Sequence, residues 1–294
     1  MNHNQMTPSP LDRSLRIGLF GLVALVGVAL WNPAGNFWFG VEFPKAQCEA
    51  YDPVALKSAT TLSESVYAPV KLARLFREPQ NTVSNLAYAV VGLAILLAGR
   101  RPASRALGWA GIFLGWGSGI YHASLLPEWR MVDILGVYAV LFCLLFVGVV
   151  ALVPWFTRRA FELTGAILTW GFAIYTGVHR NDIRVGGVKI FDSTYVMVVS
   201  VALGCLLALL ASRRANNRTG YWRAVAVLAV TAPVAFIGGQ GDRYGGFLAS
   251  PQAMIQGHAA WHVLGAAAIL AAYEVFVATG FDRSTLTPEQ VPND

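Results

Sequence analysis

Long runs of apolar residues dominate this chain and restrict what it can fold into. A helix that crosses about 30 Å of hydrocarbon needs about 20 mostly apolar residues. Eight stretches satisfy this requirement: residues 16–38, 83–99, 106–125, 132–153, 161–178, 193–212, 222–239 and 256–278. Of the 294 residues, 55% are hydrophobic and 13% are charged, a balance that exceeds what a soluble domain needs for its core. The sequence therefore predicts an all-α, polytopic transmembrane helical bundle.

Basic residues recur in short clusters between the apolar runs. The clusters are Arg100, Arg101 and Arg105, then Arg158 and Arg159, then Arg213, Arg214 and Arg218. Although the net charge is +6, this distribution argues against a nucleic-acid surface and favours cytoplasmic loops under the positive-inside rule. We therefore expect a multi-pass protein, of the bacterial inner membrane, with both termini in the cytoplasm.

The segments outside the apolar runs complete this organisation. Residues 1–15 and 280–294 are typical of disordered tails, and residues 39–80 form an extracytoplasmic segment. Residues 16–38 have two interpretations, a signal peptide or a retained helix. No A-x-A-like cleavage site follows, and aromatic residues near its end resemble an interfacial belt, which favours the helix. The sequence thus predicts a seven-helix core at 81–279, with one additional N-terminal transmembrane helix.

Polar and ionisable residues gather at the outer ends of three predicted spans. Ser118 and His122 lie near the outer end of the third span, and Asp133 lies at the start of the fourth. His258 and His262 begin the eighth span. Residues four apart lie on one helix face, with Cβ atoms roughly 5–6 Å apart. Two helices therefore offer three imidazoles to one point, on the outer, periplasmic side of the membrane.

Three neutral histidines with one open coordination position are typical of a catalytic zinc site. Zinc at such a site activates a water molecule and polarises a carbonyl group. Asp133 would serve as the base or orienting carboxylate, and the Ser118 hydroxyl would donate to the oxyanion. The sequence thus predicts that His122, His258 and His262 bind Zn²⁺ in a hydrolytic centre.

Each of these residues also has a structural interpretation. Membrane histidines can hydrogen-bond a neighbouring helix, and a serine such as Ser118 can allow close helix packing. Asp133 can stabilise a helix start through the helix dipole. Three of the five histidines lie at outer helix ends, which favours a functional role. Two other functions remain open: a zinc-containing receptor or transporter without turnover, and a cytochrome with His122 and His262 as axial haem ligands.

The chain resembles the alkaline ceramidase family from about Glu78 to Tyr273. The resemblance rests on three ordered motifs, "EPQNTVSN" at 78–85, "GSGIYHASLLPEWRMVD" at 117–133 and "HAAWH" at 258–262. The wider superfamily of intramembrane hydrolases includes the progestin and adiponectin receptors. The resemblance implies zinc on the three histidines, oxyanion or water stabilisation by Ser118, and proton transfer by Asp133. It implies hydrolysis of a ceramide-like membrane lipid to a fatty acid and a long-chain amine, with an ester lipid as the alternative.

The chain departs from this family in its N-terminal part. The family has seven spans, so the span at 16–38 is an addition. Residues 40–80 separate what is, in eukaryotic members, a compact acidic calcium site before the first core helix. Glu78 matches the final acidic position of that site, whereas Glu49 and Asp52 match its upstream part only partly. Glu78 and Glu49 are therefore candidate Ca²⁺ ligands by resemblance. Asn81 and Asn85 are explained as readily by helix capping or interhelix hydrogen bonding as by a role as ligands.

Overall fold

The computed structural model describes residues 78–124, 127–153, 158–180, 182, 184–185, 188–191, 193–241 and 257–282. The predicted helix at 16–38, the segment up to residue 77 and the first tail lie outside these residues. Glu49 and Asp52 lie outside them as well. Of the predicted second tail, residues 280–282 are described, and they form a turn after the last helix.

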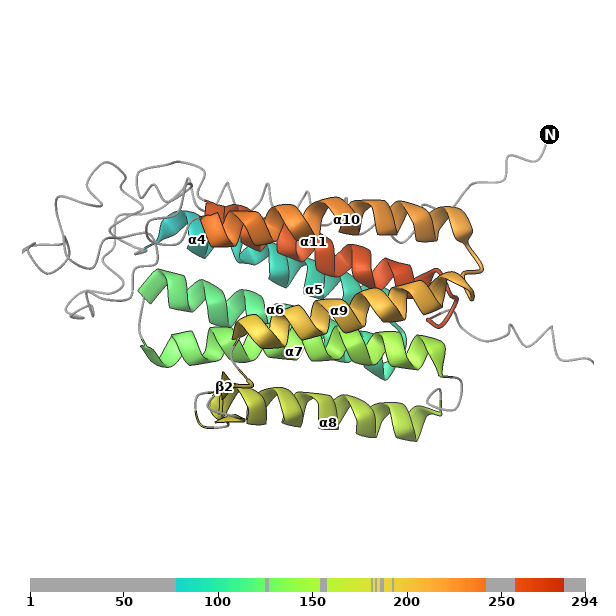
Figure 1. Ribbon diagram of the computed structural model, residues 1–294, viewed down its shortest axis with the longest axis horizontal. Coiled ribbons are helices and arrows are strands. Elements are labelled where there is room, and N and C mark those ends of the chain that lie inside the picture. Colours follow the sequence, from blue (N-terminus) through green and yellow to red (C-terminus); the bar gives the residue numbers. More distant parts are fainter. Residues whose placement is uncertain are drawn as a thin grey trace, which may run out of the picture.

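The described chain is a bundle of long helices, which confirms the all-α prediction (Figure 1). The helices are α4 (Pro79–Ser84), α5 (Leu86–Ala98), α6 (Pro102–Ser124), α7 (Pro127–Leu152), α8 (Arg159–Val178), α9 (Ser193–Ser212), α10 (Arg218–Gly241) and α11 (Gly257–Val277). Asn85, between α4 and α5, keeps helical backbone angles, so these two helices form one rod. Two short antiparallel strands, β1 (Arg184–Val185) and β2 (Val188–Lys189), lie in the α8–α9 connection.

Among the described residues, five helices are long and apolar enough to cross a membrane. They are Gln80–Ala98, Glu128–Leu152, Tyr195–Ser212, Arg218–Gly239 and Gly257–Val277. The other two predicted spans correspond to α6 and α8, which are 23 and 20 residues long. Both carry polar side chains that face the protein, including Ser118 and His122 on α6 and Glu162 on α8. Polar groups buried inside the bundle contribute to the lower hydropathy of these two helices.

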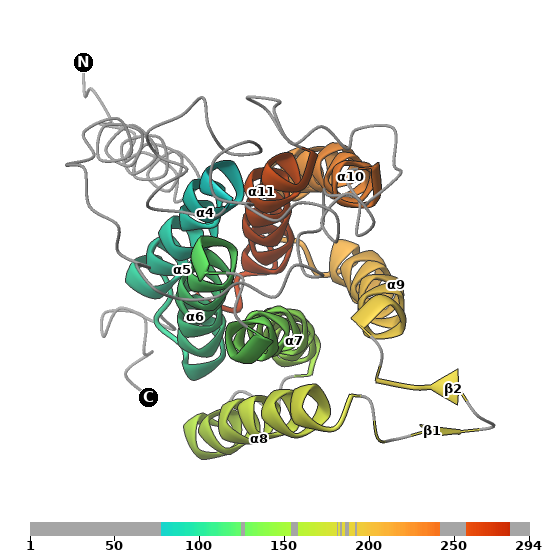
Figure 2. The ribbon, with the colours of Figure 1, turned by 90° about the vertical axis from the view of Figure 1, so that its left-hand side faces the viewer.

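The two helices that carry the predicted histidines each pack against several others. Helix α6 contacts α4, α5, α7 and α8, whereas α11 contacts α10, α5, α4, α7 and α9 (Figure 2). Glycines permit a close approach between α5 and α6. A Cβ atom built on Gly92 would lie 2.6 Å from the carbonyl oxygen of Gly108. Small residues of this kind let membrane helices pack backbone to backbone, and this packing holds α4–α5 against α6.

A buried ion pair joins α8 to the start of α6. The Arg101 guanidinium donates to Glu162 Oε2 through Nε at 2.9 Å and Nη2 at 2.6 Å. The other carboxylate oxygen accepts from the backbone N–H of Ala103 at 3.0 Å. Glu162 is 1% exposed, so this pair compensates a carboxylate that would otherwise be costly to bury.

Asp282, which follows α11, accepts hydrogen bonds from residues at or just before the start of α6. One carboxylate oxygen accepts the backbone N–H groups of Arg100 and Arg101, at 3.1 and 3.2 Å. The other accepts the hydroxyls of Ser104 at 2.9 Å and Tyr273 at 2.5 Å. The three arginine clusters of the sequence lie at this end of the bundle, where α5, α9 and α11 finish and α6, α8 and α10 begin.

Candidate metal centre

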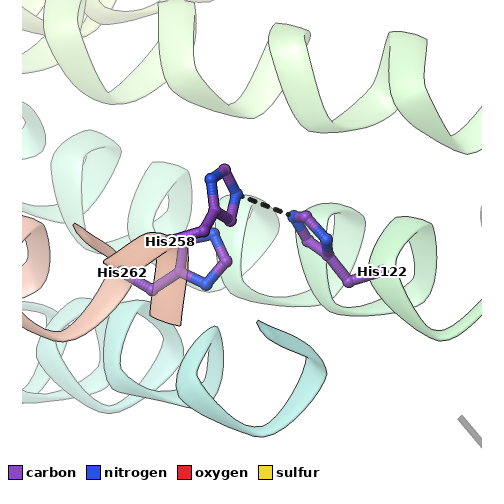
Figure 3. Close-up of side chains that lie close together, drawn as sticks. All are labelled: His122, His258 and His262. Carbon is purple, nitrogen blue, oxygen red and sulfur yellow. Dashed lines mark hydrogen bonds between the residues drawn. The ribbon is translucent and has the colours of Figure 1, made fainter. Parts of the chain in front are cut away.

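Three histidines meet at the opposite end of the bundle. His122 lies near the end of α6, and His258 and His262 lie in the first turns of α11 (Figure 3). One potential ligand atom from each side chain lies within 4.8 Å of the others. The ring centroids are 4.8 Å apart for His122 and His258, 5.1 Å for His122 and His262, and 4.6 Å for His258 and His262. The structure thus brings together all three imidazoles that the sequence singled out.

Two residues in or next to α4 contact the Nδ1 atoms of two of these imidazoles. Glu78 Oε2 lies 2.6 Å from His122 Nδ1, and the Glu78 backbone N–H donates to the His122 carbonyl at 3.1 Å. Ser84 Oγ lies 2.8 Å from His262 Nδ1. A histidine that binds a metal through one nitrogen usually hydrogen-bonds through the other. Residues Glu78 and Ser84 occupy these supporting positions.

The hydrogen-bond network determines which nitrogen of His262 carries the proton. The Ser84 hydroxyl donates its only proton to the Asn81 carbonyl at 3.0 Å. It must therefore accept a proton from His262 Nδ1, which leaves Nε2 with a free lone pair. His122 Nδ1 likewise donates to the Glu78 carboxylate, so its Nε2 also keeps a lone pair. Both residues are thus in the tautomer that metal ligation through Nε2 requires.

The distance between two of the imidazoles fits zinc. His122 Nε2 and His258 Nε2 are 3.2 Å apart (Figure 3). Two nitrogens bound tetrahedrally to zinc at about 2.0–2.1 Å would lie roughly 3.4 Å apart. His122 and His262 are buried, whereas His258 is half-buried. Three imidazole nitrogens match the protein ligands of a catalytic zinc site, in which water or substrate takes the fourth position.

Glu78 is held as a carboxylate beside His122. Burial raises the pKa of the Glu78 carboxyl, but the hydrogen bond and charge of His122 and a hydrogen bond from Asn81 outweigh this effect. The net pKa of Glu78 therefore lies below its usual value. Asn81 Nδ2 donates to the same oxygen at 3.1 Å. An anionic Glu78 suits the orientation of a metal-binding imidazole.

The two asparagines do not act as side-chain helix caps. Asn81 lies inside α4, and Asn85 precedes α5 without a capping side-chain hydrogen bond. Instead, Asn85 Nδ2 donates to the Asn81 carbonyl at 2.8 Å. The Oδ1 atoms of both residues are buried without a hydrogen-bond partner in the described part of the chain. The calcium site stays a prediction, because Glu49 lies outside the described residues and Glu78 Oε2 is engaged by His122.

Ser118 and Asp133 lie one helical turn deeper in the bundle than the histidines. Ser118 is buried one turn before His122 on α6. A Cβ atom built on Gly117 would contact the Val132 side chain at 2.9 Å. Because α6 and α7 run in opposite directions, Ser118 and Asp133 each lie about 1.5 Å from this contact in opposite senses, so their levels along the bundle differ by about 3 Å. Asp133 is half-buried in α7. Their position beneath the histidine cluster is compatible with contact to a reacting group, and their catalytic roles stay predictions.

The supporting role of Ser84 was not anticipated from the sequence. Ser84 belongs to the segment "EPQNTVSN", and it follows Glu78 by six residues. Helical spacing places residues six apart about 600° around the axis, so it does not indicate that both side chains face histidines. The contact depends on how α4 lies across α6 and α11. Only the tertiary packing could reveal it.

The fold and the site together define a bundle of helices apolar enough to span a membrane, with a three-histidine cluster at one end that could hold a metal ion. Among protein families, the ceramidase family matches residues 71–291. Because the match covers most of the chain, the protein belongs to the ceramidase family. Neither the curated proteins nor the solved structures compared with the chain give a match.

Proposed function

We propose that this protein is an integral-membrane, zinc-dependent amidohydrolase that cleaves the N-acyl linkage of ceramide-like lipids. The products would be a fatty acid and a long-chain amine. The observation that carries the proposal is the convergence of His122, His258 and His262 at one end of an apolar bundle. Membership of the ceramidase family supports the substrate class.

His122, His258 and His262 would hold the zinc ion. When bound there, zinc supplies Lewis-acid chemistry, activating water and polarising the amide carbonyl. Asp133 would accept the proton of the attacking water and later deliver it to the leaving nitrogen. The Ser118 hydroxyl would donate to the oxyanion of the tetrahedral species. Glu78 and Ser84 would keep two imidazoles in the required orientation and tautomer.

The substrate is a membrane lipid, so it would reach the metal centre from the bilayer, with its amide at the level of the histidines. At the arginine-rich end, the Tyr221 hydroxyl donates to the Ala208 carbonyl at 2.8 Å and joins α9 and α10. The two helices diverge toward the histidine end (Figure 1).

The orientation of the centre in the membrane is part of the proposal. All three arginine clusters lie at the end of the bundle opposite the histidines. Under the positive-inside rule this end faces the cytoplasm. We therefore propose that the active site faces the periplasm of a bacterial inner membrane.

Other functions predict different properties for the same histidines. A receptor or transporter would bind zinc without turnover, and an esterase would prefer oxygen esters over amides. A haem between His122 and His262 is disfavoured, because His258 Nε2 lies 3.2 Å from His122 Nε2 in the space between them. The amidohydrolase is the function that best fits three nitrogen ligands, which leave the fourth zinc position to water or substrate.

Lipid hydrolysis by the purified full-length protein tests the proposal. We expect release of fatty acid from N-acylsphinganine in detergent micelles, loss of that activity with chelator, and its recovery with zinc. His262→Ala should abolish both zinc binding and hydrolysis. His179→Ala is the matched control, since His179 is an outer-loop residue apart from the cluster. Zinc-loaded wild-type protein that releases no fatty acid would refute the amidohydrolase, and preferential cleavage of an ester analogue would reassign it as an esterase.

A further inference from the structure

Tyr88 is a buried residue beside the metal centre to which the mechanism above gives no role. It follows Ser84 by four residues on the continuous α4–α5 rod, so both lie on the same helix face. The Tyr88 ring meets the His262 imidazole edge to face, with centroids 5.9 Å apart and planes inclined by 64°. Because α5 runs inward from the histidine end, Tyr88 lies one turn beneath the centre.

The hydroxyl end of Tyr88 occupies a place on α11 where there is no side chain. Gly265 lies three residues after His262, and a Cβ atom built on it would be 2.6 Å from Tyr88 Oη. A larger residue at this position would push the phenol away from α11. Gly265 therefore allows the hydroxyl to reach the level just below the metal ligands.

The groups around this hydroxyl leave its proton available. The Trp261 indole lies within hydrogen-bonding reach of Tyr88 Oη, and Asp133 lies within electrostatic range. An indole N–H can only donate, whereas a phenol both accepts and donates. Tyr88 would accept from Trp261 and offer its own proton to a bound molecule.

The location of Asp133 indicates which part of a bound lipid would accept a hydrogen bond from the Tyr88 hydroxyl. In the proposed function, on which this inference rests, Asp133 protonates the leaving nitrogen while Ser118 serves the acyl oxygen. Because the charge of Asp133 reaches Tyr88, we place the Tyr88 hydroxyl on the amine side of the substrate. We propose that Tyr88 is a specificity-determining residue that donates a hydrogen bond to a hydroxyl group of the long-chain amine, next to the scissile nitrogen.

This role restricts the substrate to N-acyl amino alcohols. A site built to hydrogen-bond a substrate hydroxyl rejects an analogue without it, because a buried polar group is then left unpaired. Removing the Tyr88 hydroxyl removes both the favourable bond and that penalty. Tyr88→Phe should therefore erase the preference for the hydroxylated lipid rather than lower every activity equally.

Competing substrates measure this preference directly. The zinc-loaded full-length protein would be assayed with N-acylsphinganine and with its 3-deoxy counterpart, and the two kcat/KM values compared. We expect the wild type to prefer the hydroxylated lipid by at least ~10-fold, and Tyr88→Phe to prefer it by less than ~2-fold. Zinc content should be unchanged. Tyr221→Phe is the matched control, because it removes a hydrogen-bonded tyrosine hydroxyl at the opposite end and should keep the wild-type preference.

Several results would overturn the inference. A wild type without preference, or a Tyr88→Phe variant that keeps the preference or loses the same factor on both lipids, would contradict hydroxyl recognition while leaving the hydrolase intact. Hydrolysis of neither lipid by the zinc-loaded wild type would refute the proposed function itself, and this inference with it. If Tyr88→Phe does not fold, Gly265→Ala makes the same test, since its methyl group would displace the phenol.

Discussion

Replacing Ser84 with alanine should weaken zinc binding without removing any metal ligand. Ser84 Oγ accepts from His262 Nδ1 at 2.8 Å, and His262 is 3% exposed. The change would remove one acceptor of this buried N–H and leave the Asn81 backbone, which also hydrogen-bonds the His262 ring, so the cost falls at the lower end of the usual range of about 1–3 kcal/mol. Loss of a supporting partner typically lowers metal affinity by about 10–100-fold, or about 1.4–2.7 kcal/mol. The lower ends of the two ranges agree, so we expect the zinc Kd to rise by about 10-fold.

Competition with a chromophoric chelator would measure this Kd in detergent-solubilised protein. Ser104→Ala is the matched control, because Ser104 is also buried and hydrogen-bonds a side chain, Asp282, at the opposite end. It should leave the zinc Kd within about 2-fold of the wild type, since distant sites act independently. Equal zinc affinity in Ser84→Ala and in the wild type would show that α4 does not orient His262.

Three further predictions concern catalysis, orientation and stability. Asp133→Asn should retain zinc but hydrolyse N-acylsphinganine at least ~100-fold more slowly, because asparagine cannot accept a proton; turnover within a few-fold of the parent would leave only the helix-start role. In a protein without its native cysteines, Glu128→Cys should react with an impermeant thiol reagent from the periplasmic side, whereas labelling only after membrane opening would invert the topology. Glu162→Gln should lower stability by about 1–3 kcal/mol by replacing the charge-assisted hydrogen bonds of Arg101 with neutral ones, with zinc content unchanged. A melting temperature equal to that of the wild type would show that the pair does not stabilise the fold.

Helix positions were largely predictable because the hydrocarbon core requires long apolar segments. The predicted spans 193–212 and 256–278 nearly coincide with α9 (Ser193–Ser212) and α11 (Gly257–Val277). The start of α7 was placed at residue 132, whereas the helix begins at Pro127. Its first turn contains Glu128 and lies beyond the apolar run. Apolar content locates the part of a helix that lies in the hydrocarbon core. It does not locate the helical turns that extend beyond that core, so the predicted helix is too short.

The histidine cluster was predictable to the extent that it depends on helix geometry. The spacing of His258 and His262 places them on one face, and the alternation of spans brings His122 to the same end. The contacts of Glu78 and Ser84 depend on the angle at which α4 crosses the other helices, which no local pattern encodes. The resemblance associated Glu78 with calcium, whereas its carboxylate contacts His122. The sequence gives no signal for Tyr88, since its neighbour Gly265 is 177 positions away.

The central claim is that three imidazoles from α6 and α11 hold one zinc ion. X-ray absorption at the zinc edge of the purified wild-type protein tests it most directly. We expect one zinc per chain, with nitrogen or oxygen neighbours at about 2.0–2.1 Å and the outer-shell scattering of three imidazoles. His258→Ala should lose most of the metal and the corresponding imidazole signal. A wild-type protein purified and reloaded with zinc that binds none, or that binds it through sulfur at about 2.3 Å, would contradict the three-histidine centre.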